Sequence, residues 1–511
     1  MSLTGSRRRI GARGCLCAFA LAGALSAAAG ASSTSDSARS ELQLELGDLL
    51  LGDERYWEAI AAYERAKVGA TPAQTLRASG GLLRSLLTVA EFNRAHREAL
   101  FLGGLGSPDP EIRSLQADAF WAYGLFDEAE ELYRDVLAEH PASSAARHGL
   151  ARSLAARNRL EEALVEARAA TAADTARGEF YHTLGSIYRR LHRYPEAGDA
   201  LEQYVARLPT VRRNRRNEWA RSEVRLLRSF GDRVPFEIAR DPDGLHTIPF
   251  RLEQDKVVVR GRVNGGDVID LVVDTGAEQM VLSQQTAERM GVPAVTTTIS
   301  AGVGEVGVRG LEIGRVDTLE IGSLEVRNLP AIIKNPPLTD LPVRRVRDSI
   351  SPVALGLSAA LDYETRQMML GRRLPDGPAD IELPMRIHRL ALVRGVLNEE
   401  FPRSFVVDTG GEVVSLSIGT VGSIGLAPPR HIPLQVFGTS GWDKEAFLLP
   451  GVRLAFSNQI RYDNLAVIVL NLHRPSALLG FHIGGIVGHT FLRNYRVALD
   501  MERALLRLTR L

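Results

Sequence analysis

The spacing of hydrophobic positions changes once along the chain. Over residues 40–230, Ala and Leu recur every three or four positions and Pro is confined to a few turn-like places, which is typical of helices. From Thr247 onwards, short runs of Val, Ile and Leu alternate with turns that contain Gly and Asn, which is typical of β-strands. An Asp-Pro-Asp-Gly turn at 241–244 separates the two patterns. The sequence therefore predicts a multidomain chain, an all-α part followed by an all-β part.

The helical part repeats with a period of 34 residues. Ala129, Ala163 and Ala197 are 34 positions apart, and a Glu precedes each of them. Two further steps back, of 34 and 36 residues, also end on alanine. This period, with a small residue where two helices approach closely, resembles the tetratricopeptide repeat (TPR). The resemblance implies a TPR-like solenoid over 40–233, whose concave surface holds a peptide or protein; a scaffold or oligomerisation module is the alternative.

The end of the predicted solenoid is strongly basic. Eight arginines fall within 211–233, interleaved with Trp219 and two leucines. We expect a solvated helix that closes the solenoid, with binding to an anionic surface as the alternative.

The β part contains one short motif twice. Asp-Thr-Gly occurs at 274–276 and again at 408–410, 134 positions later, and each copy ends an apolar run. Each copy is followed by two apolar residues and a glycine, at 354–356 and 486–488, and then by a similar closing strand. This internal duplication indicates that one β fold is built twice.

The duplication predicts two related lobes, at 245–375 and 384–511, joined by a connection rich in Pro, Asp and Arg. An apolar strand normally avoids ending on a carboxylate, because burying a charge without partners is costly. Two lobes that each end such a strand on an aspartate bring two carboxylates, Asp274 and Asp408, to one place. Like charges at short range share one proton, since one pKa rises and the other falls.

Two Asp-Thr-Gly motifs, each with its own apolar-apolar-Gly, resemble the aspartic proteases of the pepsin and retropepsin type. The resemblance covers about 245–511 and implies that Asp274 and Asp408 form a catalytic pair. In that chemistry the ionised carboxyl takes a proton from water, the protonated carboxyl donates to the peptide carbonyl oxygen, and water attacks the carbon. It requires no metal and no cofactor.

The resemblance also assigns supporting roles beside each aspartate. Thr275 and Thr409 are expected to hydrogen-bond across the two lobes. Gly276 and Gly410 are expected to leave room for the backbone to turn beneath the carboxylates.

Further expectations concern the later glycines and the hairpins that cover a substrate in this family. Gly356 and Gly488 are expected behind the motif loops, and flaps are expected at 298–310 and 437–442. Six positions separate Gly356 from the next aspartate, against twelve in the second lobe, so the first lobe is expected to lack a helical turn. Gly411 stands where pepsin-like enzymes have Ser or Thr and is a departure from the family pattern.

Composition narrows these possibilities. The chain has 511 residues, 45% of them hydrophobic and 24% charged, which is normal for a globular protein. The net charge of +1 gives no reason to propose nucleic acid as a partner. The only cysteines, Cys15 and Cys17, lie near the amino end, so the rest of the chain has no Cys nucleophile or Cys metal site. The histidines show no metal-ligand spacing and are interpreted as surface or hydrogen-bonded residues.

The amino end is typical of an export signal. Arginines at 7–9 and 13 precede an apolar run over 15–29, and small residues follow it. We expect a cleaved signal peptide at 1–31 and a periplasmic or secreted protein. An uncleaved membrane anchor is the alternative, although the run is short for a span of ~20 residues.

The sequence thus predicts an exported aspartic endopeptidase whose substrate is a peptide or protein. The TPR-like part is expected to present that substrate or to dock a partner. The alternative is a binding protein that holds a peptide on the duplicated fold without cutting it.

Overall fold

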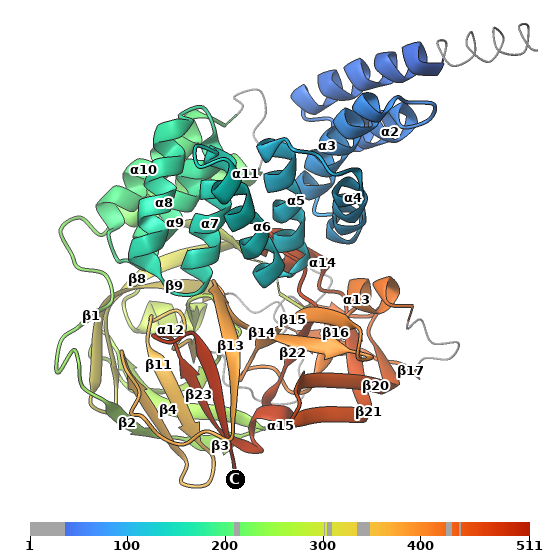
Figure 1. The fold of residues 1–511 in the computed structure, drawn as a ribbon. Coiled ribbons are helices and arrows are strands. Elements are labelled where there is room, and N and C mark those ends of the chain that lie inside the picture. Colours follow the sequence, from blue (N-terminus) through green and yellow to red (C-terminus); the bar gives the residue numbers. More distant parts are fainter. Residues whose placement is uncertain are drawn as a thin grey trace, which may run out of the picture. The chain divides into compact units, whose positions relative to one another are not determined.

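The structure is a computed structural model that describes residues 36–208, 215–300, 302–303, 309–334, 348–425, 432–438 and 441–511. The chain divides into two units, Met1–Ser107 and Pro108–Leu511. The predicted fold class is confirmed, since helices fill the first part of the chain and strands the second (Figure 1). The division between the units falls within the helical part, so the later helices and both β lobes form one unit. The predicted signal segment lies outside the described residues.

The first unit consists of paired helices. Its helices are a helix at 36–52, α2 (Tyr56–Ala66), α3 (Pro72–Thr88) and α4 (Phe92–Leu105). The Tyr63 ring fills the space between Gly47 and Gly81, where a Cβ on either glycine would fall within 3 Å of the ring. Thr71 accepts a hydrogen bond from the backbone of Gln74 and caps α3. Close approach at small residues therefore shapes these helix pairs, as the repeat pattern predicts.

The helices of the second unit continue the repeat. They are α5 (Pro110–Tyr123), α6 (Phe126–Glu139), α7 (Ser144–Ala156), α8 (Leu160–Ala173), α9 (Gly178–Arg190), α10 (Tyr194–Ala206) and α11 (Arg215–Arg228). The repeat alanines Ala129, Ala163 and Ala197 are fully buried. Gly149 lies so close to the Tyr133 ring that a Cβ would clash with it. The 34-residue period therefore reflects contacts between neighbouring helices.

The last of these helices, α11, differs from the expectation of a solvated cap. Ala220, Leu226 and Leu227 are buried, and α11 packs against α10 on one side and a β-strand of the first lobe on the other. The arginine count predicted exposure, but the apolar residues between the arginines form a continuous buried stripe.

The first β lobe contains the first Asp-Thr-Gly motif. Its elements are β1 (Glu237–Ile238), β2 (His246–Pro249), β3 (Arg251–Glu253), β4 (Lys256–Val263), β5 (Val268–Val273), β6 (Met280–Ser283), α12 (Gln284–Arg289), β7 (Ala294–Ser300), β8 (Arg309–Ile321), β9 (Leu324–Lys334), β10 (Ser349–Ile350), β11 (Ser358–Asp362) and β12 (Gln367–Gly371). One sheet runs in the order β1-β9-β6-β10-β5-β4-β8-β7, with β3 beside β4.

The second lobe repeats this arrangement around the second motif. Its elements are β13 (Ile381–His388), β14 (Leu390–Leu397), β15 (Phe401–Val407), β16 (Ser415–Ser417), α13 (Ile418–Ser423), β17 (Ile432–Pro433), β18 (Val436–Gly438), β19 (Gly441–Asp443), β20 (Phe447–Ser457), β21 (Ile460–Leu470), α14 (His473–Leu479), β22 (Gly485–Val487), α15 (His489–Leu492), β23 (Tyr495–Asp500) and β24 (Leu505–Arg510). β14, β15, β16 and β22 have the same pairings with one another as β4, β5, β6 and β10.

The two lobes are joined by a shared sheet. Its order, β13-β24-β23-β11-β12-β2, places the closing strands of the two lobes side by side, with Ala360 opposite Ala498 (Figure 1). Because β11 and β23 pair antiparallel, the lobes are tied together by main-chain hydrogen bonds as well as by side chains.

The helices of the second unit share a hydrophobic core with the β lobes. Phe126 on α6 lies edge-to-face with Phe481, with ring centroids 5.4 Å apart. Trp121 lies against His388, and Arg386 forms an ion pair with Asp127. This core explains why these helices and the lobes form one unit. Within the described residues, no helix has both the length and the apolar character needed to cross a membrane.

Candidate active site

Both aspartates leave the sheet in the same way. In the first lobe β5 runs parallel to β10, and the Asp274 backbone N–H donates to the Ile350 carbonyl at 2.8 Å. In the second lobe β15 runs parallel to β22, and the Asp408 N–H donates to the Val487 carbonyl at 3.0 Å. The repeated strand pairing therefore presents two carboxyls from equivalent positions.

The threonines that follow the aspartates hold the two motifs together. The Thr275 hydroxyl donates to the Val407 carbonyl at 2.7 Å and accepts the Thr409 N–H at 3.0 Å. The Thr409 hydroxyl donates to the Val273 carbonyl at 2.6 Å and accepts the Thr275 N–H at 3.1 Å. Both threonines are fully buried, so each hydroxyl has a donor role and an acceptor role away from water. These are the cross-lobe hydrogen bonds that the sequence resemblance implies.

Backbone amides hold each carboxyl in place. Asp274 Oδ1 accepts the Gly276 N–H at 3.0 Å, and Asp408 Oδ1 accepts the N–H groups of Gly410 at 2.8 Å and Gly411 at 2.9 Å. Hydrogen bonds from backbone amides favour the ionised form of a carboxyl. Asp408 therefore has one more such stabilising contact than Asp274.

The glycine of each motif lies against the aspartate of the other lobe. A Cβ on Gly276 would lie 2.5 Å from Asp408 Cγ, and a Cβ on Gly410 would lie 2.5 Å from Asp274 Oδ1. Such distances leave no room for a side chain. These positions need glycine because of this close approach. The departure at Gly411 fits the same geometry, since a Cβ there would lie 2.9 Å from Asp408 Oδ2.

The electrostatics of the pair separate the two aspartates. Burial, the negative charge of Asp408 and a side-chain hydrogen bond with Asp408 raise the pKa of Asp274 to about 7. The nearby Lys334 cation and the Gly276 N–H act in the opposite direction. Burial and the neighbouring Asp408 charge therefore favour the protonated form of Asp274.

The structure corrects the predicted position of the first apolar-apolar-Gly motif. The strand that pairs with β5 is β10, so Ser349-Ile350-Ser351 takes the place that 486–488 takes in the second lobe. Gly356 instead lies in an open turn at φ +68°, where the nearest atom to a Cβ would be His192 Nε2 at 3.7 Å. The prediction for Gly356 was wrong because the first lobe has a serine where the pattern requires glycine.

The expected missing helical turn is confirmed in that the second lobe has α15 after Gly488 whereas residues 351–357 of the first lobe form no helix, but the expected difference in length is wrong. Counted from Ser351, Asp362 follows after eleven positions, and Asp500 follows Gly488 after twelve. The two lobes are therefore close to equal in length between the strand beside the motif and the closing strand. Gly488 does lie behind its motif loop, where a Cβ would fall 2.5 Å from the Val413 carbonyl oxygen.

Hairpins lie at both predicted flap positions. β7 and β8 form the first, with Ser300 opposite Arg309, and β18 and β19 form the second, with Gly438 opposite Gly441. A Cβ on Gly438 would lie 2.3 Å from the Val303 carbonyl oxygen, so the two hairpins touch each other. The tips at 304–308 and 439–440 lie outside the described residues.

The carboxyls open into one large cavity of about 1810 Å³. Both aspartates line it, together with residues from both hairpins, from the turn between β13 and β14 and from α7 and α9. A cavity of this size accommodates a peptide segment longer than the residues that flank one bond.

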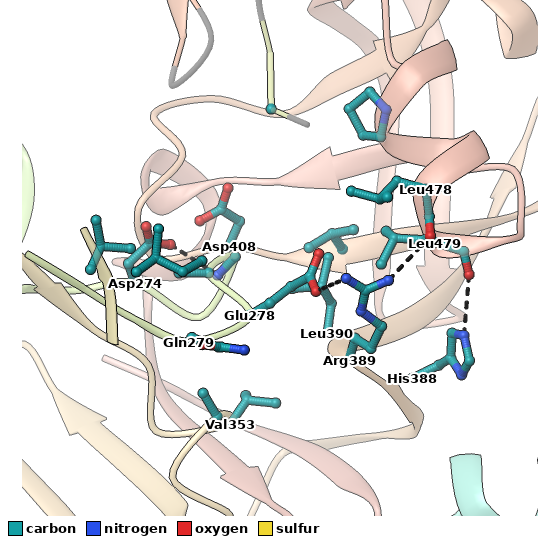
Figure 2. A pocket seen from close by; sticks show the side chains of 18 of the residues that line it. Asp274, Glu278, Gln279, Val353, His388, Arg389, Leu390, Asp408, Leu478 and Leu479 are labelled. Atoms are coloured by element: carbon teal, nitrogen blue, oxygen red, sulfur yellow. Dashed lines mark hydrogen bonds and ion pairs between the residues drawn. The ribbon is translucent and has the colours of Figure 1, made fainter. Parts of the chain in front are cut away.

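Several charged residues in this cavity were not singled out from the sequence. Lys334 lies at the end of β9, and Lys256 donates from the start of β4 to the Gly410 carbonyl. Glu278, four positions after Asp274, forms an ion pair with Arg389 of the second lobe (Figure 2). Their spacing in sequence gives no sign of this proximity, because it depends on how the lobes meet. Charged residues next to an Asp-Thr-Gly motif, such as Glu278, are the one available hint.

One histidine also departs from the expectation. His388 is half-buried and donates to the Leu479 carbonyl, and His482 is buried and hydrogen-bonded to Ser417 and Thr420. His489 is fully buried, and neither of its ring nitrogens has a hydrogen-bond partner among the described residues. Among the described residues, no group of three or more His, Cys, Asp or Glu side chains is arranged to hold a metal ion.

Comparison with known families agrees with this architecture. Residues 259–342 match the family described as gag-polyprotein putative aspartyl protease, and residues 120–187 match the tetratricopeptide repeat family. The chain carries a retropepsin-like domain and TPR repeats. The protease match covers β4 to β9 and so includes the first Asp-Thr-Gly motif, while the second motif lies beyond it.

Solved structures similar to this chain are TPR proteins. A thermophilic TPR protein of Thermus thermophilus is 19% identical, with a TM-score of 0.30, over 34% of this chain and 93% of its own. YrrB, a TPR protein with an unusual peptide-binding site, is 17% identical, with a TM-score of 0.23, over 33% and 86%. MamA of Desulfovibrio magneticus is 13% identical, with a TM-score of 0.26, over 33% and 94%. No curated protein matches the chain.

Proposed function

We propose that this protein is an aspartic endopeptidase that hydrolyses peptide bonds in polypeptide substrates, with Asp274 and Asp408 as its catalytic pair. The observation that carries the proposal is the reciprocal hydrogen bonding of Thr275 and Thr409. It places the loops of two aspartates against each other, each with the other motif's glycine beneath it. An Asp-Thr-Gly turn with only a structural role would need neither a second copy of the motif nor hydrogen bonds between the two motifs.

The roles proposed for the two aspartates are supported by the burial of Asp274 beside Asp408 and by the additional backbone hydrogen bond that Asp408 accepts. Ionised Asp408 removes a proton from water, the water oxygen bonds to the peptide carbonyl carbon, and protonated Asp274 donates its proton to the carbonyl oxygen. Asp408 then gives its proton to the amide nitrogen, the carbon–nitrogen bond breaks, and a hydroxyl of the intermediate returns a proton to Asp274. The pair ends in its starting state, and no covalent enzyme intermediate forms.

The proposed enzyme differs from aspartic proteases that need two copies of the chain to form one active site. Both motifs lie in one unit, joined by β11–β23 pairing, so one chain supplies the complete pair. The match to the tetratricopeptide repeat family supports the proposal that the TPR helices take part in protein interaction, with the polypeptide substrate or with a protein partner.

The experiment is digestion of a mixed peptide library from pH 3 to pH 8 by the purified chain, followed by mass spectrometry. The matched control is the double variant Asp274→Asn, Asp408→Asn, whose side chains keep nearly the same size. Cleavage by the parent and not by the folded control supports the proposal. A folded parent that cuts no peptide at any pH overturns it and favours a protein that binds peptides without cutting them.

We also propose export of the protein to the periplasm or the medium, with removal of residues 1–31. The basic start, apolar run and small residues of that segment support the proposal. Amino-terminal sequencing of the protein from the exported fraction tests it, and a mature chain that still begins at Met1 in the cytoplasmic fraction contradicts it.

A further inference from the structure

The cavity that contains the aspartates extends to helices α5, α7 and α9 of the helical part. Residues of α5, α7 and α9 line it together with the pair, among them Trp121, Arg152 and Arg190. All of them belong to the second unit, Pro108–Leu511. A polypeptide bound at the aspartates therefore meets the solenoid within the same cavity.

Arg190 lies where α7, α9 and the second lobe meet. Its guanidinium donates to the Ala155 carbonyl at 2.6 Å, the Ile387 carbonyl at 3.1 Å and the Asn158 side-chain oxygen at 2.8 Å. These acceptors are neutral. A guanidinium has five N–H donors, so donors are left for a further partner. Burial and the neighbouring Arg189 lower the pKa of Arg190 to about 10, since no carboxylate offsets its charge.

Arg152 and His388 line the same cavity as Arg190, and Arg152 is ion-paired with Asp118. Arg152 bonds to Asp118 and to the Tyr133 hydroxyl through one nitrogen, and its buried Nε has no hydrogen-bond partner among the described residues. The ring of His388 lines the same wall and donates to the Leu479 carbonyl at 3.2 Å. Burial, with the charges of Arg389, Arg152 and Arg190, lowers the pKa of His388 to about 3. Three arginines therefore act on one half-buried, neutral imidazole.

The basic residues that line this part of the cavity, Arg190, Arg152, His388 and Arg389, begin close to the catalytic pair. Glu278 lies four positions after Asp274 and pairs with Arg389, which also donates to the Leu478 carbonyl at 3.1 Å. Figure 2 shows Arg389 between Glu278, near the aspartates, and Leu478, with His388 beyond. The carboxylate of Glu278 neutralises Arg389, whereas no carboxylate among the described residues neutralises Arg190 in this way.

We propose that Arg190 binds a carboxylate of the substrate polypeptide, so that the enzyme prefers chains with an acidic residue on the side of the scissile bond that faces the solenoid. Hydrogen bonds between a guanidinium and a carboxylate are the strongest that a peptide side chain can supply here. A carboxylate there would neutralise a cation that the folded chain holds beside three neutral acceptors. The inference rests on the proposed binding of a polypeptide in the cavity.

The test measures binding separately from cleavage. Fluorescence anisotropy would follow labelled peptides bound to the Asp274→Asn protein, which retains the cavity. The peptides share one central sequence and carry flanking Asp, Asn or Lys on either side. A further pair ends in a free carboxylate or an amide, which distinguishes a side-chain carboxylate from a chain terminus.

We expect the peptide with Asp on one particular side of the central sequence to bind about tenfold more tightly than the peptide with Asn at the same place. Asp on the other side should give no such difference. Adding Arg190→Met should abolish this difference, and Arg190→Lys should restore part of it. If the Asp and Asn peptides bind equally, or if their difference survives Arg190→Met, the proposal is overturned. Tight binding of the peptide that ends in a free carboxylate, together with weak binding of the peptides with an internal Asp, would overturn the side-chain preference. It would assign the site to the carboxylate of a chain terminus.

Arg315→Met is the matched control. Arg315 is a second arginine at the junction between helices and lobes and donates to the Ser229 carbonyl at 2.7 Å, but it does not line the cavity. Loss of a structural contact alone should weaken all peptides alike in both variants. If the parent cuts no peptide but the Arg190-dependent binding preference is present, the proposed hydrolysis fails and the carboxylate site stands. If the parent cuts peptides but the Asp, Asn and Lys peptides bind equally, the carboxylate site fails and the proposed hydrolysis stands.

Discussion

Thr275 and Thr409 each satisfy the other's backbone N–H while donating to a carbonyl in the opposite lobe, at 2.7 Å and 2.6 Å. The relation is reciprocal, and both side chains are fully buried. Because neither hydroxyl can turn to water, the two motif loops are fixed relative to each other. The positions of the two carboxyls therefore follow from the threonines more than from the aspartates themselves.

Thr275→Val should loosen both loops. The substitution keeps the shape of the side chain but leaves the Val407 carbonyl and the Thr409 N–H without their partner. An unsatisfied buried group costs about 1–3 kcal/mol, so we expect a loss of about 2–4 kcal/mol in the free energy of unfolding. Chemical denaturation measures it, and activity should fall by more than the loss of folded protein explains.

Thr275→Ser is the matched control because it keeps the hydroxyl. A loss of about 1 kcal/mol from the missing methyl is expected, with activity largely retained. If valine and serine are equally well tolerated, the cross-lobe hydrogen bonds do not have the role assigned to them.

Gly276→Ala should abolish activity while a matched glycine substitution does not. A Cβ at Gly276 would stand 2.5 Å from Asp408 Cγ, so the carboxyl must move. At Gly422 on α13 nothing lies within 4 Å of a Cβ. We expect kcat/KM to fall at least about 100-fold for Gly276→Ala and to change less than about twofold for Gly422→Ala, since misplacement of about 1 Å at a reacting group costs about that factor. Comparable activities in the two variants would contradict the close-approach argument.

Lys334 should set the upper pH limit of activity. Its cation lowers the pKa of Asp274, which still stands at about 7. Activity requires the proton on Asp274, so kcat/KM should fall as the pH rises through about 7. Lys334→Met removes the opposing charge, so the fall of kcat/KM should occur at higher pH in this variant. Lys334→Arg keeps the charge and should leave the pH of this fall unchanged. If kcat/KM of the Met variant falls at the same pH as in the parent, Lys334 does not act on the pair.

The same pKa predicts how stability depends on pH. Asp274 ionises near 3.8 in the unfolded chain and near 7 in the fold, so the fold binds the proton more tightly between these values. Its contribution to stability is complete below pH 3.8 and is lost as the pH rises through about 7. Asp274→Asn cannot ionise, so its stability relative to the parent should rise over this range, by about 1–2 kcal/mol after screening by water in the open cavity. A constant difference in unfolding free energy from pH 4 to pH 8 would contradict the raised pKa.

The shared core predicts which truncations fold. Leu390, Leu392 and Phe481 pack against Trp121 and Phe126 of the helices. A chain that begins at residue 235 would expose these side chains and should aggregate. A chain that begins at residue 108 keeps the whole second unit and should unfold in one cooperative transition. Circular dichroism and size-exclusion chromatography compare them; a soluble, folded chain from residue 235 would show that the helices are dispensable for the lobes.

Much of this arrangement is predictable because it repeats. The 34-residue alanine period, the change to short apolar runs and the two Asp-Thr-Gly motifs each rest on more than one stretch of sequence, so one stretch supports the interpretation of another. The pairing of Asp274 with Asp408 follows from the same logic. The prediction fails where the two copies have diverged: Ser351 stands in the place of Gly488, and the sequence pattern points to the nearby Gly356 instead.

Other features depend on contacts that no local pattern encodes. Glu278 and Arg389 come together only because the two lobes meet, and Arg190 reaches the second lobe only because α9 packs onto it. The exposure of α11 was predicted from its arginines, but its buried stripe exists only against β7 and α10. The touching hairpins at Val303 and Gly438 likewise follow from tertiary packing.

The central claim is that Asp274 and Asp408 act as one proton-sharing pair. The most direct measurement is kcat/KM from pH 3 to pH 8 for the parent and for Asp274→Asn and Asp408→Asn separately, on one peptide that the parent cuts, with folding checked by circular dichroism. The account predicts that each single substitution alone removes at least about 1,000-fold of the activity, because neither role can be filled by the other carboxyl. A variant that stays folded and keeps activity within about tenfold of the parent would contradict the shared pair.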